Sequence, residues 1–153
     1  MTPDALPHLR RARDLADRRY AEPLDLHALA TEAGFSTYHF ARLFREAFGE
    51  TPRAYLTRRR VERAKHLLAN ANLTVTEVCD LVGFASLGSF SSRFTELVGV
   101  PPSEYRRRQA ARGGPPPVPG CFVMAWARPR GEATVERADG SASGEKRGGP
   151  ARA

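Results

Sequence analysis

Two arginines and a tyrosine share one face of a segment whose other face is rich in phenylalanine. Tyr38, Ala41, Arg42 and Arg45 recur at i, i+3, i+4 and i+7, the spacing of one face of an α-helix. The residues predicted to pack inward are Phe40, Leu43, Phe44, Ala47 and Phe48. An arginine can pair bidentately with guanine in the major groove, and a tyrosine can contact a thymine methyl group or a phosphate. In a single amphipathic helix these arginines would more often form an ordinary solvated face. The internal repeat and the basic net charge described below reverse that interpretation and favour a helix face that reads bases of double-stranded DNA.

A second segment has the same layout with weaker chemistry. The corresponding stripe consists of Gly88, Ser91, Ser92 and Thr95, with Leu87 and Ser89 near the helix start. No long donor stands at the centre of this stripe, and serine hydroxyls discriminate poorly between bases. We expect the first helix to make the direct base contacts and the second to contribute phosphate contact, apolar contact through Leu87, and recognition of DNA shape.

Further polar residues near both helices are candidates for contact with the DNA backbone. These are Ser36, Thr37, Arg45, Arg53, Ser86, Ser89, Arg93 and Arg106. A wider set of possible phosphate contacts adds Arg58, Arg59, Arg63, Arg107 and Arg108. Arg60 differs from these because it falls among the packing positions of its helix, so we expect an internal structural arginine.

Catalytic and metal-binding chemistry find little support in the sequence. The four histidines share no metal-ligand spacing, and neither paired carboxylates nor a phosphate-cradling glycine loop is present. Cys79 lies on an apolar helical face and is expected to be buried, and Cys121 stands alone, so a cysteine-dependent alkyl-transfer enzyme is disfavoured. We expect no enzymatic activity, no cofactor and no metal.

The elements that must position these residues are helices with recognisable ends. Apolar spacing predicts a helix in residues 5 to 20, and Asp25 caps a helix that stops at Gly34. Ser36 caps the next helix, which forms a helix-turn-helix with the one before it. A longer helix begins at Pro52, with Thr51 as its cap, and is predicted to run to Ala69. It would be about 27 Å long and would connect the segments on either side of it.

The chain then repeats itself. Leu26, Leu29, Ala30, Ala33, Gly34 and Phe35 recur, displaced by 49, as Val75, Val78, Cys79, Val82, Gly83 and Phe84. Phe40, Phe44, Gly49, Pro52 and Tyr55 recur, displaced by 50, as Phe90, Phe94, Gly99, Pro102 and Tyr105. The predicted fold is all-α, with two helix-turn-helix subdomains bridged by a long helix. We place the DNA-binding domain at 5–111, with a first unit at 5–50, the linker helix at 52–69 and a second unit at 74–109.

The rest of the chain reads as a tail. Residues 112–153 begin with the Pro/Gly-rich stretch GGPPPVPG and become polar and glycine-rich, which predicts a mostly disordered, flexible segment. Its one apolar run, CFVMAWA at 121–127, is expected to fold back as a short strand or extended clamp, with docking to a partner as the alternative.

Charge and hydropathy agree with a nucleic-acid partner. The formal net charge of the 153 residues is +7, which suits a polyanion. No apolar run approaches the roughly 18 residues needed to span a bilayer, and the N-terminus has no signal-peptide core, so we expect a cytoplasmic protein without membrane contact. An architectural or weakly specific DNA binder, and a partner-docking module acting through 121–127, remain alternatives.

The repeated segments resemble the AraC/XylS family of bacterial transcription regulators over residues 5 to 108. The similarity lies in the glycine-phenylalanine turn, the paired phenylalanines, the glycine and the proline that occur in both units, and in the tyrosine-arginine that ends the second unit. The resemblance implies seven helices, two recognition helices in successive major-groove segments, and base-facing positions at Tyr38, Ala41, Arg42, Leu87, Gly88, Ser91 and Ser92. Gly88, Ser92 and Thr95 depart from the serine, arginine and lysine that are frequent in the family, which weakens the specificity expected of the second helix. Because no sensing domain fits in this chain, it resembles the small stand-alone members, which implies binding to DNA as a monomer and contact with RNA polymerase.

Overall fold

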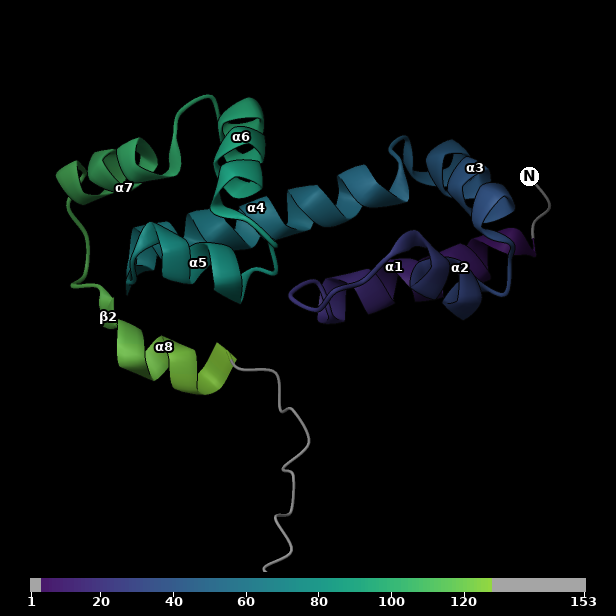
Figure 1. The fold of residues 1–153 in the computed structure, drawn as a ribbon, viewed down its shortest axis with the longest axis horizontal. Helices are drawn as coiled ribbons and strands as arrows, with labels where there is room; N and C mark the ends of the chain where they lie inside the picture. The colour runs from purple at the N-terminus through teal and green to yellow at the C-terminus, as the bar shows by residue number, and fades with distance from the viewer. Residues whose placement is uncertain (1–3, 128–153) are drawn as a thin grey trace, which may run out of the picture.

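Two groups of helices are joined by one long helix in the structure, a computed structural model that describes residues 4–127 (Figure 1). The helices are α1 (Ala5–Arg18), α2 (Leu26–Ala33), α3 (Thr37–Phe48), α4 (Pro52–Asn70), α5 (Val75–Leu81), α6 (Leu87–Val98), α7 (Pro102–Ala111) and α8 (Gly120–Ala127). Two short strands, β1 (Ala71–Asn72) and β2 (Val118–Pro119), complete the described part. The two helix-turn-helix subdomains bridged by a long helix are confirmed, and α8 is additional to the seven helices expected.

Helices α2, α3 and α4 begin at the predicted caps because local hydrogen bonds satisfy their free backbone groups. The side chains of Asp25, Ser36 and Thr51 accept hydrogen bonds from the backbone at the starts of α2, α3 and α4. Thr74 and Glu77 form a reciprocal capping box at the start of α5. Helix α1 ends at Arg18, two residues before the predicted end, and α4 continues one residue further, to Asn70.

Each helix-turn-helix unit has its own hydrophobic core. In the first, Phe44 lies 5.7 Å from Tyr55, ring centroid to ring centroid, with an interplanar angle of 73°. In the second, Phe94 lies 5.6 Å from Tyr105 with the same angle. The sequence repeat is therefore also a repeat of packing.

Helix α4 belongs to both cores. Its first half contributes Tyr55 and Leu56 to the first core, and its second half contributes Val61, Ala64 and Leu68 to the second. Its 19 residues span about 28 Å, so the predicted connecting helix is confirmed. In the second unit α4 takes the place that α1 holds in the first.

The loop between α1 and α2 also joins the two units. Arg60 donates hydrogen bonds from Nε to the Tyr20 carbonyl at 2.6 Å and from Nη2 to the Glu22 carbonyl at 2.8 Å. The backbone of Ala21 lies so close to Gly83 that a Cβ there would be 2.7 Å from the Ala21 carbonyl oxygen. The expectation that Arg60 is an internal structural arginine is confirmed.

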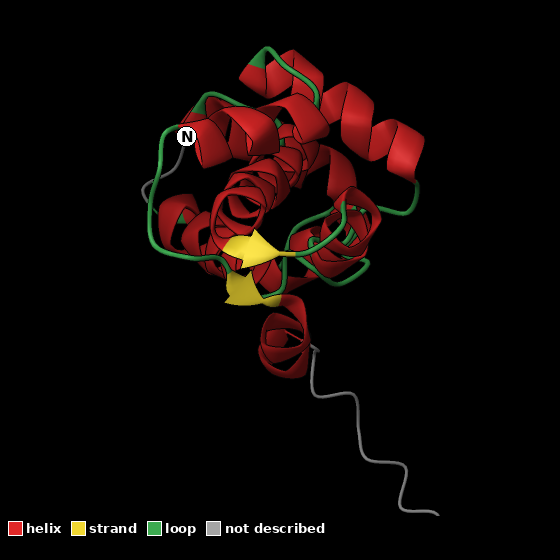
Figure 2. Cartoon of the chain, turned by 90° about the vertical axis from the view of Figure 1, so that its left-hand side faces the viewer, coloured by secondary structure: helices red, strands yellow, loops and turns green. Residues whose placement is uncertain are grey.

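The tail folds back on the second unit. β2 pairs in parallel with β1, as the two yellow strands of Figure 2 show. Val123 and Met124 of α8 pack against the second core. The expectation that 121–127 forms a strand or extended clamp is wrong, because Val118 and Pro119 take the strand position and residues 120–127 form a helix. The remaining residues of the predicted flexible tail, 128–153, lie outside the described residues.

Within residues 4–127, no helix combines the length and apolar character that crossing a bilayer requires.

Candidate nucleic-acid interface

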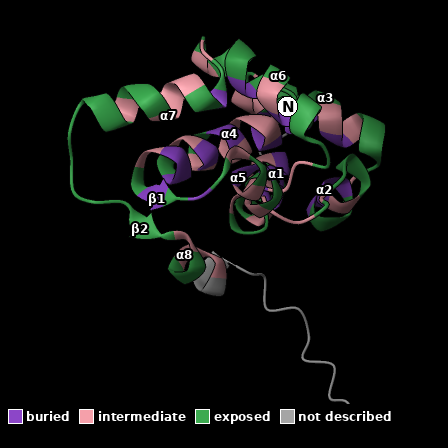
Figure 3. Cartoon of the chain, turned by 60° about the vertical axis from the view of Figure 1, so that its left-hand side comes forward, coloured by how far each residue is buried: buried purple, intermediate pink, exposed green. Residues whose placement is uncertain are grey.

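The two predicted recognition helices pack at different points along α4. Figure 1 shows α6 above the middle part of α4 and α3 beyond its first end, and in Figure 3 both lie in the upper part of the molecule. The buried residues of each helix belong to its own core, and the residues on the other side are exposed. One long helix therefore connects two helices that each have an exposed polar face.

Helix α3 exposes the predicted arginine and tyrosine side chains. Tyr38 is 81% exposed, and Arg42 and Arg45 are exposed one and two turns further along. Ala41 is half-buried between them. Phe40 and Phe44 are fully buried on the opposite face, which fixes the rotation of the helix about its axis.

The start of α3 is held by a cap and by packed rings. Ser36 Oγ accepts a hydrogen bond from the His39 backbone N–H at 3.4 Å, and Thr37 beside it is exposed. The His39 ring packs edge-on against Phe35 at 5.4 Å, which confirms a packing role for this histidine. A nitrogen of the Arg42 guanidinium lies 3.5 Å from His39 Nδ1, so a packed ring lies beneath the exposed arginine.

Helix α6 presents smaller groups. Leu87 is 44% exposed, Gly88 and Ser92 are exposed, and Ser91 is half-buried. The Thr95 hydroxyl donates to the Ser91 carbonyl at 2.8 Å. Arg93, the long cation of this helix, is exposed but pairs with Glu96 at 2.8 Å. Ser86 caps the helix through the Ser89 N–H, and both serines are exposed.

The candidate phosphate contacts divide into available and internally paired arginines. Arg45 and Arg53 are exposed, and neither guanidinium pairs with a carboxylate within residues 4–124. Arg58 pairs with Glu50 and Glu62, and Arg59 with Asp17 and Glu62. Arg107 and Arg108 both pair with Glu104, and Arg63 lies 3.3 Å from His66 Nδ1.

Arg106 occupies a position that sequence reasoning missed. Its Nε and Nη2 atoms are buried without a hydrogen-bond partner in the described part of the chain. Burial lowers the pKa of the Arg106 guanidinium, and the nearby Glu77 carboxylate opposes that shift. A phosphate contact through Nε or Nη2 of Arg106 therefore requires a rearrangement of this side chain.

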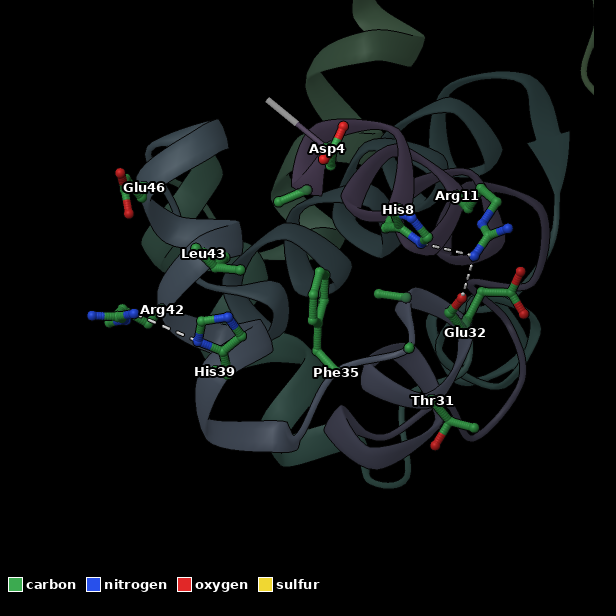
Figure 4. Close-up of a pocket in the computed structure, with 13 residues that line it drawn as sticks. Asp4, His8, Arg11, Thr31, Glu32, Phe35, His39, Arg42, Leu43 and Glu46 are labelled. Atoms are coloured by element: carbon green, nitrogen blue, oxygen red, sulfur yellow. Dashed lines mark hydrogen bonds between the residues drawn. The ribbon is translucent and has the colours of Figure 1, made fainter. Parts of the chain in front are cut away.

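A cavity of about 620 Å³ beside α3 was also not predicted from the sequence. We name it the Gly34 groove, after the glycine that ends α2 on its floor. Its lining comes from α1, from the end of α2 and its turn, and from α3 (Figure 4). The lining residues used below are Thr31, Gly34, Phe35, His8, Arg11 and Arg42. Local sequence patterns carry no signal for it, because three separate helices form its walls.

Comparisons with known proteins agree with this geometry. A family model described as a helix-turn-helix domain matches residues 29–108. Over 83 residues the chain is 39% identical to the RCS-specific HTH-type transcriptional activator RclR of Escherichia coli, which covers 54% of this chain and 29% of RclR. The chain spans less than half of the length of the curated relatives it matches.

Solved structures match over a larger share of their length. The DNA-binding domain of the global transcriptional factor AdpA, determined in complex with a target DNA, superposes with a TM-score of 0.66 at 32% identity. That match covers 68% of this chain and 94% of the AdpA chain. A transcriptional regulator of the AraC type from Chromobacterium violaceum superposes with a TM-score of 0.64 at 29% identity, covering 72% of this chain and 98% of that one.

Proposed function

The chain belongs to the AraC-type helix-turn-helix family, and we propose on that premise that it is a sequence-specific, double-stranded-DNA-binding regulator of transcription. Helices α3 and α6 enter successive segments of the major groove. The relatives matched are transcriptional regulators and activators by name, not enzymes. The helix-turn-helix architecture thus supports a binding function and no catalytic one.

One observation carries the proposal most directly: the exposed Tyr38–Arg42–Arg45 face of α3. A helix that buries two phenylalanines and exposes two arginines presents donors to a polyanion. Helices α3 and α6 both contact α4, and in this proposal both face one side of a duplex, whose turn is about 34 Å long.

The two readers have unequal roles in this proposal. Tyr38, Ala41 and Arg42 contact bases, with Arg42 the principal donor to guanine. The second groove segment is recognised through apolar and phosphate contacts and through DNA shape, by Leu87, Gly88, Ser91 and Ser92. Backbone contacts come from a wider set: Ser36, Thr37, Arg45, Arg53, Ser86, Ser89, Arg93 and, after rearrangement, Arg106.

The proposal extends to assembly and partners. The two units differ in their base-facing residues, so one copy bound as a monomer reads an asymmetric site. RNA polymerase is the proposed protein partner of the DNA-bound chain, in line with the word activator in the names of two relatives. The place of action is the cytoplasm, where bacterial DNA lies.

The test is selection of bound sites from a random DNA library at near-physiological salt, with the full chain and its Arg42→Ala variant. We expect an asymmetric motif of two half-sites about one turn apart. Arg42→Ala weakens binding to that motif by about ten- to a hundredfold and relaxes one half-site, because a bidentate arginine contributes about 1–3 kcal/mol of discrimination.

Two matched variants complete this experiment. Ser92→Ala on α6 is expected to change affinity less than about threefold, and Arg10→Ala, an exposed arginine on α1, controls for the loss of one charge. Equal effects of Arg42→Ala and Ser92→Ala would overturn the unequal roles. Absence of any enriched motif, with binding that collapses on modest addition of salt, would establish the architectural class instead.

A further inference from the structure

The sequence repeat creates two equivalent grooves, one beside each helix-turn-helix turn. Gly34 and Phe35 of the first unit correspond to Gly83 and Phe84 of the second. Helix α1 corresponds to the second half of α4 with a displacement of 52, which matches the buried residues Leu9, Ala12 and Ala16 with Val61, Ala64 and Leu68. The same displacement matches His8 with Arg60. Each groove therefore has a side chain with ring or guanidinium nitrogens at its edge.

In the second unit this groove is filled by the chain itself. The α1–α2 loop runs across Gly83, where its Ala21 backbone leaves no room for a Cβ. Two main-chain carbonyls of the loop, those of Tyr20 and Glu22, accept hydrogen bonds from Arg60. The Arg60 guanidinium lies 5.9 Å from the Phe84 ring centroid, so it lies above the aromatic floor of the groove. The occupant is thus a loop segment in a turn conformation, in which the Glu22 N–H donates to the Arg19 carbonyl at 3.0 Å, and it is recognised through its backbone.

In the first unit no described residue, within 4–124, fills the equivalent groove. A Cβ built at Gly34 meets nothing within 4 Å, in contrast to the contact at Gly83. The space above it is the cavity of about 620 Å³. Figure 4 shows Phe35 in the middle of the groove, with His8 and Arg11 on one side and His39 and Arg42 on the other. The two halves of one molecule therefore show the same site with and without its occupant.

The open groove keeps the donors that recognition of a backbone needs. His8 stands at the position of Arg60 and lies 6.0 Å from the Phe35 ring, centroid to centroid. Arg11, one turn further, brings Nη2 to 3.1 Å from His8 Nδ1 and makes only a long contact of 3.4 Å to the Glu32 carbonyl. A guanidinium has five N–H donors, so Arg11 retains several for carbonyl oxygens of an incoming segment.

We propose that the Gly34 groove is a docking site for a turn-forming loop segment of a partner protein. The segment crosses Gly34 with a small residue, as Ala21 crosses Gly83, and turns main-chain carbonyls toward His8 and Arg11. Because Arg42 lines the same groove, the docked segment lies directly beside the DNA-reading face of α3.

The test uses the segment that fills the second groove as its probe. A synthetic peptide of residues 18–25, RRYAEPLD, is titrated into the isotope-labelled full chain, and backbone amide chemical shifts are followed by NMR. We expect saturable shifts at Thr31, Gly34, Phe35 and Arg11, with the region of Gly83 unchanged, because the tethered loop has a far higher effective concentration there than the free peptide.

Matched variants decide between docking and simple charge attraction. Arg11→Met removes the proposed donor and is expected to weaken peptide binding about three- to tenfold. Arg10→Met removes an exposed arginine that does not line the groove and is expected to leave binding unchanged. A scrambled peptide is expected to cause no saturable shift.

Other outcomes would overturn the proposal. Equal weakening by both variants, or equal binding of the scrambled peptide, would mean non-specific attraction. Shifts at Gly34 that grow with protein concentration in the absence of peptide would assign the groove to a second copy of this chain. Shifts confined to the second unit, or no shifts at all, would show that the first groove does not receive a loop segment of this kind. None of these readouts depends on DNA binding, so failure here is distinct from failure of the proposed function.

Discussion

At the scale of single residues, the arginines of this chain differ by what their guanidinium groups contact. Arg58 and Arg59 are held by carboxylates of the first unit and of α4 itself. Arg60 binds two carbonyl oxygens of a loop that lies 38 to 40 positions earlier in sequence. Arg42 and Arg45, by contrast, extend from an exposed helix face. Similar side chains on adjacent helices therefore separate into structural arginines and exposed ones, which we propose face DNA.

Tyr55 is the residue for which the structure predicts a specific titration. It is buried, and its hydroxyl donates to Asp17 Oδ1 at 2.7 Å. Burial, with the hydrogen bond to Asp17 as the second cause, raises the pKa of Tyr55 to about 12. The unfolded value is about 10, so the stabilisation is fully present below pH 10 and is lost as the pH rises toward 12.

The measurement is the absorbance of ionised tyrosine as a function of pH. We expect a component with a pKa of about 12 that disappears in Tyr55→Phe. Asp17→Asn is expected to lower the pKa of Tyr55, because it removes the nearby negative charge that favours the neutral phenol. Asp14→Asn, one turn earlier and exposed, serves as the control and should leave that component in place. An unchanged titration in Asp17→Asn would contradict the role assigned to the hydrogen bond.

At the scale of elements, the two helix-turn-helix turns share a conformation but not their surroundings. Gly34 and Gly83 both adopt positive φ, 74° and 91°. At Gly83, but not at Gly34, the backbone of another segment, that of Ala21, lies where a Cβ atom would be. A side chain at Gly34 meets conformational strain alone, and one at Gly83 meets strain and collision.

This difference predicts unequal costs for the same substitution. Gly34→Ala should lower the free energy of unfolding by about 1 kcal/mol, the cost of a left-handed alanine. Gly83→Ala should lower it by about 2 kcal/mol more, because the Ala21 backbone must move away. Chemical denaturation of the two variants measures both values. Equal losses would show that the α1–α2 loop does not press on Gly83 in solution.

At the scale of the whole molecule, the relative placement of the two readers is determined by three connections. Helix α4 contributes to both cores, Arg60 binds the α1–α2 loop, and that loop lies against Gly83. The tail adds a further contact, because β2 and α8 cover the end of α4 and the start of the second unit. Spacing between α3 and α6 on DNA therefore depends on contacts distant from either reading face.

The tail contact can be tested at Gly120. A Cβ at this position would lie 2.5 Å from the Asn72 carbonyl oxygen, so Gly120→Ala should detach β2 from β1. We expect amide hydrogen exchange at Asn72 and Leu73 to accelerate about tenfold, which corresponds to a loss of about 1.4 kcal/mol of local protection. Gly114→Ala, where nothing lies within 4 Å of the added Cβ, is the control. Equal exchange in both variants would mean that the strand pair contributes no protection.

The sequence by itself determined the local structure and most of the reading faces. Helix starts at Asp25, Ser36 and Thr51 were predictable because a cap is a contact between residues two or three positions apart. The two cores were predictable because helical periodicity and the internal repeat constrain which faces pack. The exposure of Tyr38 and Arg42 followed from the same periodicity.

Only the tertiary structure decided which distant segments meet. The burial of Arg106, the docking of the α1–α2 loop on Gly83, the helical form of 120–127 and the open Gly34 groove all depend on contacts between residues far apart in the chain. A repeat in sequence predicts two equivalent surfaces, but it does not show which of them the chain covers. The physical reason is that the single α1–α2 loop can reach only one of the two grooves. The two sites are therefore equivalent in sequence but differ in what covers them.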